Sequence, residues 1–220
     1  RPQPPSMPQI SRSQIQAHQI TFSWTPGRDG FAPLRYYTVQ LRENDGPWTL
    51  LPERVDPVVS SYTASSLKPH TTYQFRIQAT NDLGPSAFSR ESIVVRTLPA
   101  APAHGVENLK VVPITTTSVR VHWNPLETNM WNGDESTGGY RILYQQLSDF
   151  PTALQSTPKT DVIGINIDSV VLSDLQQDRN YEIVVLPFNS QGPGPATPPA
   201  AVYVGEAVPT GEPRAVDAAP

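Results

Sequence analysis

The chain repeats one sequence pattern twice, and this repetition limits its possible folds more than any other feature. The segment 20–26 (ITFSWTP) corresponds to 119–125 (VRVHWNP), 99 residues further along. A second pair, 73–85 (YQFRIQATNDLGP) and 181–193 (YEIVVLPFNSQGP), is 108 residues apart, so the second copy is nine residues longer (108 − 99). We therefore predict two similar domains of about 100 residues each, with insertions in the turns of the second one.

Apolar and polar residues alternate within each copy, which is the pattern of half-buried strands. Tyr73, Phe75 and Ile77 alternate with glutamine and arginine, and Tyr37 and Tyr140 begin equivalent runs in the two copies. The segment 44–46 (NDG) predicts a tight hairpin turn in which the glycine supplies the positive φ. No segment of ten or more residues has helical apolar spacing. Short strands between proline- and glycine-rich turns predict an all-β fold of two tandem β-sandwiches.

Composition excludes several classes of protein. Proline and glycine number 25 and 13 of 220 residues, about 17% of the chain, which is below the roughly 25–30% typical of unstructured sequence rich in these residues. The net charge of −4 argues against nucleic acid as a partner, because phosphate binding needs clustered lysine and arginine. The absence of cysteine excludes disulfide scaffolds and thiolate metal sites. No apolar run approaches the length of a transmembrane helix.

The two copies resemble fibronectin type III domains over essentially the whole chain. Trp24 and Trp123 stand where that family has a buried tryptophan on its second strand. The segment 67–73 (LKPHTTY) matches the family's tyrosine corner, a turn whose backbone supplies a partner for the tyrosine hydroxyl. The second copy has Gln177 and Arg179 where the motif has proline and threonine, so its corner is expected to differ in detail.

The resemblance implies seven-stranded, immunoglobulin-like sandwiches and a set of core residues. An immunoglobulin domain itself would normally carry a cysteine pair that is absent here. We predict type III domains at residues 3–98 and 103–208, followed by a linker and the start of a third repeat at 209–220, as in a fragment of a longer array. The predicted core residues are Trp24, Tyr37, Leu67, Tyr73, Trp123, Tyr140, Leu175 and Tyr181.

The sequence offers no set of residues suited to catalysis. None of the four histidines has the spacing of a zinc ligand. The adjacent carboxylates of Asp134 and Glu135 provide too few oxygen ligands for a calcium loop. Neither a nucleophile elbow nor a phosphate-binding glycine loop is present. We therefore predict no catalytic, metal-binding or cofactor-binding residue, no enzyme activity and no small-molecule substrate.

Four residues are candidates for contact with a partner protein. Trp131 lies in the longer loop of the second copy, and aromatic residues are enriched at interface anchors. The alternative, which we favour, is that Trp131 folds back onto its own domain. Arg35, Arg42 and Arg76 are predicted to lie on the outward face of the first domain, where they form either a basic contact patch or an ordinary solvated sheet face.

The segment 202–210 (VYVGEAVPT) is similar to the segments that join type III repeats in the Sidekick family of neural cell-surface proteins. That resemblance implies the extracellular portion of a single-pass plasma-membrane protein, anchored by a segment outside this chain. It also implies homophilic adhesion at synapses, with protein partners that include the same protein on an apposed or the same cell. Three alternatives remain open. The chain could instead come from another neural receptor, of the receptor tyrosine phosphatase or netrin-receptor kind, or from an intracellular muscle-type array. The third alternative is an accessory module of a polysaccharide-degrading enzyme.

Overall fold

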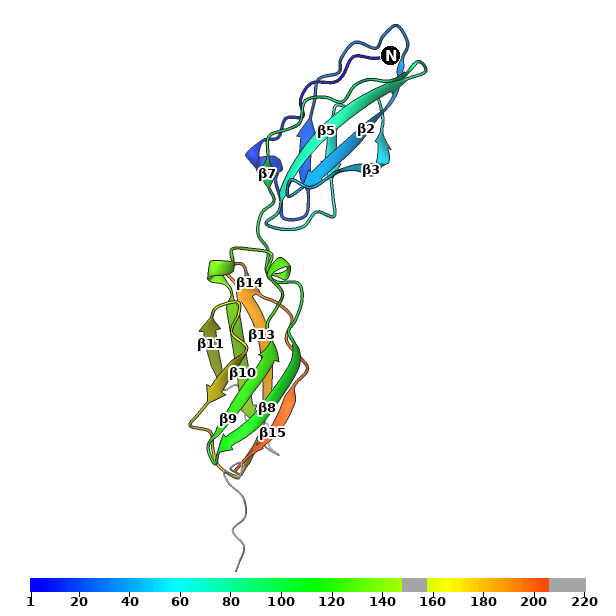
Figure 1. Ribbon diagram of the computed structural model, residues 1–220. Coiled ribbons are helices and arrows are strands. Elements are labelled where there is room, and N and C mark those ends of the chain that lie inside the picture. The colour runs from blue at the N-terminus through cyan, green and yellow to red at the C-terminus, as the bar shows by residue number, and fades with distance from the viewer. Residues whose placement is uncertain (148–157, 206–220) are drawn as a thin grey trace, which may run out of the picture. The chain divides into compact units, whose positions relative to one another are not determined.

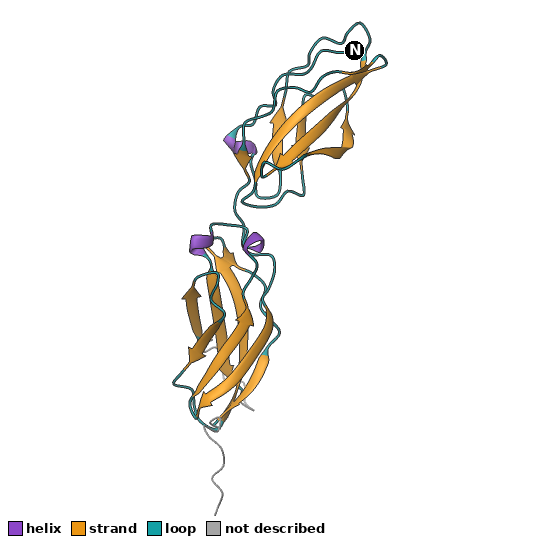
Figure 2. Ribbon diagram, in the orientation of Figure 1, coloured by secondary structure: helices purple, strands orange, loops and turns teal. Residues whose placement is uncertain are grey.

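The structure is a computed structural model that describes residues 1–147 and 158–205. Contacts between residues divide the chain into two compact units, which meet in the sequence between Ala100 and Ala101 (Figure 1). Strands dominate both units, and the helical elements described are single 3-10 turns (Figure 2). The predicted all-β fold class is confirmed. The predicted start of a third repeat at 209–220 lies outside the described residues.

The first unit contains two antiparallel sheets. One sheet pairs β1 with β4, and the other has the order β3-β2-β5, with β6 and β7 both pairing with β5. One 3-10 turn, η1, precedes the strands. The bounds are η1 Arg12–Gln14, β1 Ile20–Ser23, β2 Leu34–Glu43, β3 Trp48–Val55, β4 Ser61–Ala64, β5 Thr72–Asn81, β6 Gly84–Pro85 and β7 Val95–Arg96.

The second unit repeats this arrangement with a three-stranded sheet, β12-β9-β8, facing a sheet of order β11-β10-β13. The edge strands β14 and β15 both pair with β13. The bounds are β8 Glu107–Thr115, β9 Ser118–Asn124, η2 Thr128–Met130, η3 Glu135–Thr137, β10 Gly139–Gln146, β11 Lys159–Ile163, β12 Ser169–Leu172, β13 Arg179–Asn189, β14 Gly192–Pro193 and β15 Ala200–Val204.

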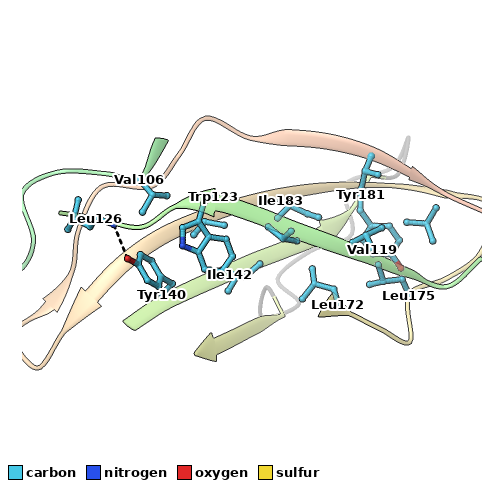
Figure 3. Packing of buried hydrophobic residues seen from close by; sticks show 14 of the residues in the cluster. Val106, Val119, Trp123, Leu126, Tyr140, Ile142, Leu172, Leu175, Tyr181 and Ile183 are labelled. Carbon is cyan, nitrogen blue, oxygen red and sulfur yellow. Dashed lines mark hydrogen bonds between the residues drawn. The ribbon is translucent and has the colours of Figure 1, made fainter. Parts of the chain in front are cut away.

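The core of each unit follows from the alternation of its strands. Along β5, every second side chain is buried, and the register of β2 against β5 places Val39 opposite Ile77. These inward side chains belong to one buried cluster with Phe22 of β1. The second unit buries an equivalent set around Trp123 and Ile183 (Figure 3). The sheets of each sandwich are therefore held together by apolar burial, at roughly 25 cal/mol for each Å² removed from water.

The hairpin between β2 and β3 forms where it was predicted, but the residues that bear the positive φ differ. Asn44 and Asp45 have φ of 50° and 57°, and Gly46 closes the turn by donating its N–H to the carbonyl of Glu43 at 2.9 Å. The prediction that Gly46 supplies the positive φ was wrong. A two-residue turn with positive φ at both central positions matches the twist of the strands, and asparagine and aspartate tolerate that conformation.

Candidate interaction surface

All eight predicted core residues are buried in their own units. In each unit a tryptophan packs against a tyrosine of the facing sheet. The Trp24 and Tyr37 ring centroids are 5.2 Å apart, and the Trp123–Tyr140 separation is also 5.2 Å. The exposed fractions are Trp24 5%, Tyr37 0%, Leu67 6%, Tyr73 3%, Trp123 0%, Tyr140 0%, Leu175 5% and Tyr181 7%. None of these side chains is available to a partner, so any interaction surface must be sought elsewhere.

Both tyrosine corners are closed by the same hydrogen bond. The N–H of Lys68 donates to the Tyr73 hydroxyl at 2.9 Å, and the N–H of Gln176 donates to the Tyr181 hydroxyl at 2.8 Å. The corner of the second unit thus closes without the proline and threonine of the motif. Tyr73 also donates to Glu43 at 3.1 Å. Burial raises the pKa of Tyr73 to about 12, against the opposing effect of the N–H of Lys68.

We expect Tyr73→Phe to destabilise the first unit by about 1–3 kcal/mol, because the N–H of Lys68 and the carboxylate of Glu43 both lose a partner. Tyr181→Phe is expected to cost less, since it orphans only one N–H. Chemical denaturation of each variant measures the loss. Tyr37→Phe is the matched control, because the buried Tyr37 hydroxyl has no hydrogen-bond partner in the described chain. Equal losses at Tyr73 and Tyr181 would mean that the Glu43 bond adds nothing.

Trp131 lies in the core of the second unit. Its side chain is 1% exposed and meets Tyr140 edge-on, with the ring centroids 5.5 Å apart. The side-chain amide of Asn189 donates to the Trp131 carbonyl at 2.8 Å, which ties the loop to the end of β13. The candidate role of Trp131 as an exposed contact residue is therefore corrected, and the favoured alternative, that Trp131 folds back onto its own domain, describes its position. The insertion places η2 and η3 on either side of Trp131, and the loop folds its ring inward.

Segment 86–92 of the first unit runs beside β5 with a period of three residues. The backbone N–H of each of three serines donates to a β5 carbonyl, and the serine hydroxyl accepts the N–H of the same β5 residue. The pairs are Ser86 with Ala79, Ser89 with Ile77 and Ser92 with Phe75. This period directs Phe88, between two of the serines, toward β5, where it contacts Arg76. Because its period is three residues and not two, the alternation that predicts strands does not predict this segment.

Arginine and aromatic side chains stack on the outward face of the β3-β2-β5 sheet. The guanidinium carbon of Arg76 lies 4.3 Å from the Trp48 ring centroid and 4.5 Å from that of Phe88. The guanidinium carbon of Arg42 lies 5.4 Å from the Trp48 centroid, because the strand register pairs these two residues. We call Arg42, Trp48, Arg76 and Phe88 the arginine–aromatic stack. The four side chains are half-buried, and each cation–ring contact contributes at least about 0.5–1 kcal/mol, the value for a fully exposed pair.

Arg35 does not share the environment of the other two predicted arginines. Its Nη2 lies 2.7 Å from Oδ2 of Asp82, and its Nε donates to Oδ1 of the same carboxylate. The Arg35 hydrogen bonds lower the pKa of Asp82 from its ordinary value. The predicted patch therefore separates into a neutralised Arg35 and the stacked pair Arg42 and Arg76. A further arginine, Arg54 of β3, stacks on Tyr36 at 4.1 Å and was not identified from the sequence.

The second unit presents a neutralised arginine on the equivalent sheet. Arg141 of β10 lies 5.3 Å from the Phe188 ring centroid, but its Nε and Nη2 donate to the two oxygens of Asp161 at 2.8 and 3.1 Å. These hydrogen bonds lower the pKa of Asp161. In the arginine–aromatic stack, by contrast, Arg76 contacts no carboxylate of the described residues and Arg42 only that of Glu91, at 3.9 Å. This difference distinguishes the first unit from the second.

The described residues place no group of three or more histidine, cysteine, aspartate and glutamate side chains where they would hold a metal ion. The Asp134 carboxylate accepts hydrogen bonds from the backbone N–H and the hydroxyl of Ser136, so it caps η3. His122 lies 3.8 Å from Asp168 at the surface. Among residues 1–147 and 158–205, no helix is long and apolar enough to cross a membrane.

Comparison with known proteins agrees with the sandwich geometry. Residues 3–95 and 101–203 match the family model of the fibronectin type III domain. The chain belongs to the fibronectin type III family. Among solved structures, the chain is similar to the crystal structure of the chicken CNTN1 FN1-FN3 domains, with a TM-score of 0.70 and 25% sequence identity. The match covers 96% of this chain and 69% of that one.

The chain is also similar, along nearly its whole length, to longer proteins with fibronectin type III repeats. It is 86% identical over 220 residues to Protein sidekick of Drosophila melanogaster, covering 100% of this chain and 10% of that protein. It is 39% identical to Protein sidekick-2 of Mus musculus, in a match that covers 98% of this chain and 11% of that protein. It is 28% identical to Cell adhesion molecule DSCAM of Gallus gallus, in a match that covers 98% of this chain and 10% of that protein. The chain spans about a tenth of the length of these relatives.

Proposed function

We propose that this chain is a non-catalytic region of the ectodomain of a cell-surface adhesion receptor, where it spaces and presents other domains. The observation that carries the proposal is the match of both units, in order, to the Sidekick and DSCAM proteins. One of these relatives is named as a cell adhesion molecule. The buried cores and closed corners support the same role, because they make each unit a stable module rather than a reactive site.

The proposed partner of the receptor is a protein, and specifically the same protein on an apposed or the same cell. The proposed setting is extracellular, with a single membrane-spanning anchor in a part of the receptor outside this chain. Homology to adhesion molecules supports both statements. The proposal assigns the adhesive contact itself to other domains of the receptor.

The test uses the full-length receptor on cells that otherwise do not aggregate. An antibody against this chain is expected to stain intact, unpermeabilised cells, and absence of staining would overturn the extracellular placement. In a second arm, residues 1–205 are exchanged for two type III domains of unrelated surface and similar length. Aggregation is expected to persist, because a spacer is defined by its dimensions. If aggregation is lost while surface expression is unchanged, the chain itself carries the adhesive surface and the spacer role is wrong.

A further inference from the structure

The first unit presents three arginines on three adjacent strands of one sheet face. Arg42 lies on β2, Arg54 on β3 and Arg76 on β5. Within the described residues, the only carboxylate that any of them contacts is that of Glu91, whose Oε2 lies 3.9 Å from Nη1 of Arg42. By contrast, Arg35 and Arg141 each bind a carboxylate through two hydrogen bonds. On a chain of net charge −4, this face is therefore a local concentration of positive charge that one long ion pair only partly neutralises.

Stacking on aromatic rings leaves donors unused on the edges of Arg54 and Arg76, whereas Arg42 donates to the Gly46 carbonyl at 3.0 Å and to Gln74 at 3.5 Å. Arg76 donates from Nε to Gln40 at 2.7 Å, and its two terminal nitrogens donate no hydrogen bond within the described chain. Arg54 stacks on Tyr36 and likewise donates none there. A guanidinium held by rings on its faces presents its N–H fork in the plane, and that fork matches an oxyanion in bidentate geometry. The arrangement is preorganised for anionic groups.

We propose that the face formed by Arg42, Arg54 and Arg76 binds a sulfated polysaccharide. The strand register places Arg54 beside Thr38, Arg76 beside Gln40 and Arg42 two residues further along β2. At about 3.4 Å per residue the three arginines span roughly 14 Å along the strand direction, a length that a short linear polyanion can cover. Sulfate groups on a stiff sugar backbone lose little conformational freedom on binding. By contrast, ordering each acidic side chain of a polypeptide costs up to about 2 kcal/mol in lost rotamer entropy. The inference rests on the proposed extracellular function, because sulfated polysaccharides are polymers of the cell surface and matrix.

The test measures binding of the whole chain to an immobilised heparin-derived octasaccharide at about 0.15 M salt, where weak long-range attraction is screened. Arg76→Gln is expected to lower the affinity about tenfold, since a charge-assisted hydrogen bond to the sulfate is lost. Arg54→Gln is expected to act in the same direction and provides a second variant outside the arginine–aromatic stack. Circular dichroism and thermal unfolding establish that each variant is folded.

Arg141→Gln is the matched control. It removes the same charge from the equivalent sheet of the second unit, where Asp161 already neutralises the arginine, so the affinity should change less than about twofold. The proposal is overturned if the wild-type chain does not bind, or if Arg141→Gln weakens binding as much as Arg76→Gln. Equally tight binding to polyglutamate of the same charge would also overturn it and point to an acidic polypeptide. Loss of binding to fully desulfated octasaccharide would support it.

The two proposals fail separately. Absence of the chain from the cell surface overturns the proposed function, whereas binding to the octasaccharide is measured with purified protein. Absence of octasaccharide binding removes the polysaccharide site and leaves the surface placement and the spacer role as they stand.

Discussion

Replacement of Trp131 by alanine is expected to destabilise the second unit by about 3–5 kcal/mol. The indole is 1% exposed and packs edge-on against Tyr140, so its removal leaves a cavity in the core. The loop would also lose the ring that anchors it beside Asn189. Chemical denaturation of the full chain measures the loss. Hydrogen exchange of the β10 and β13 amides assigns that loss to the second unit.

The control for Trp131 is Phe31→Ala in the corresponding loop of the first unit. Phe31 is fully exposed, so its truncation removes almost no buried area, and a change within about 0.5 kcal/mol is expected. If Trp131→Ala costs no more than Phe31→Ala, the placement of Trp131 in the core is wrong. The pair thus compares two aromatic residues in equivalent loops that differ in burial.

Trp24→Ala is expected to destabilise the first unit to a similar extent, by about 3–5 kcal/mol. Trp24 is 5% exposed and lies between Phe22 and Tyr37, whose ring centroids are 5.8 and 5.2 Å from its own. Hydrogen exchange should show faster opening of β2 and β5, with the strands of the second unit unchanged. Chemical denaturation of the full chain should shift the unfolding transition of the first unit to lower denaturant concentration and leave that of the second unit unchanged.

Trp48→Ala is the comparison within the same unit. Trp48 belongs to the arginine–aromatic stack on the outward face, and its loss removes two cation–ring contacts, worth about 1–2 kcal/mol together. A loss at Trp48 as large as that at Trp24 would show that the stack contributes as much to stability as the core does. That result would give the stack a structural role of its own.

The two units have equivalent but separate cores and differ in the side chains that their outward sheet faces present. Arg76 and Arg141 both lie close to an aromatic ring, but Asp161 neutralises Arg141, whereas Arg76 contacts no carboxylate among the residues that the structure describes. Substitutions on an outward face leave the inward residues of the same strand unaffected, because successive side chains point to opposite faces. A repeated fold can therefore carry one interaction surface on one copy alone.

The amino-acid sequence predicted the fold, the two copies and the tryptophan and tyrosine positions of both cores. These features depend on local patterns. Alternation with period two marks the buried face of a strand wherever that strand pairs, and the spacing of the Trp24 and Tyr73 motifs recurs in the second copy. Residues 67–73 predicted a closed corner, and the second corner closes as well, because the bond needs only a backbone N–H near the tyrosine hydroxyl.

The tertiary structure alone decided which side chains meet across strands. Trp131 is buried because the loop before β10 folds over the end of the sandwich and is tied there by Asn189, a contact between residues 58 positions apart. Arg35 is separated from the predicted patch by Asp82, 47 positions along the chain. Arg76 meets Trp48 and Phe88 because of strand register and the three-residue period of segment 86–92. Long-range pairings of this kind depend on how strands align in space, which no local periodicity encodes.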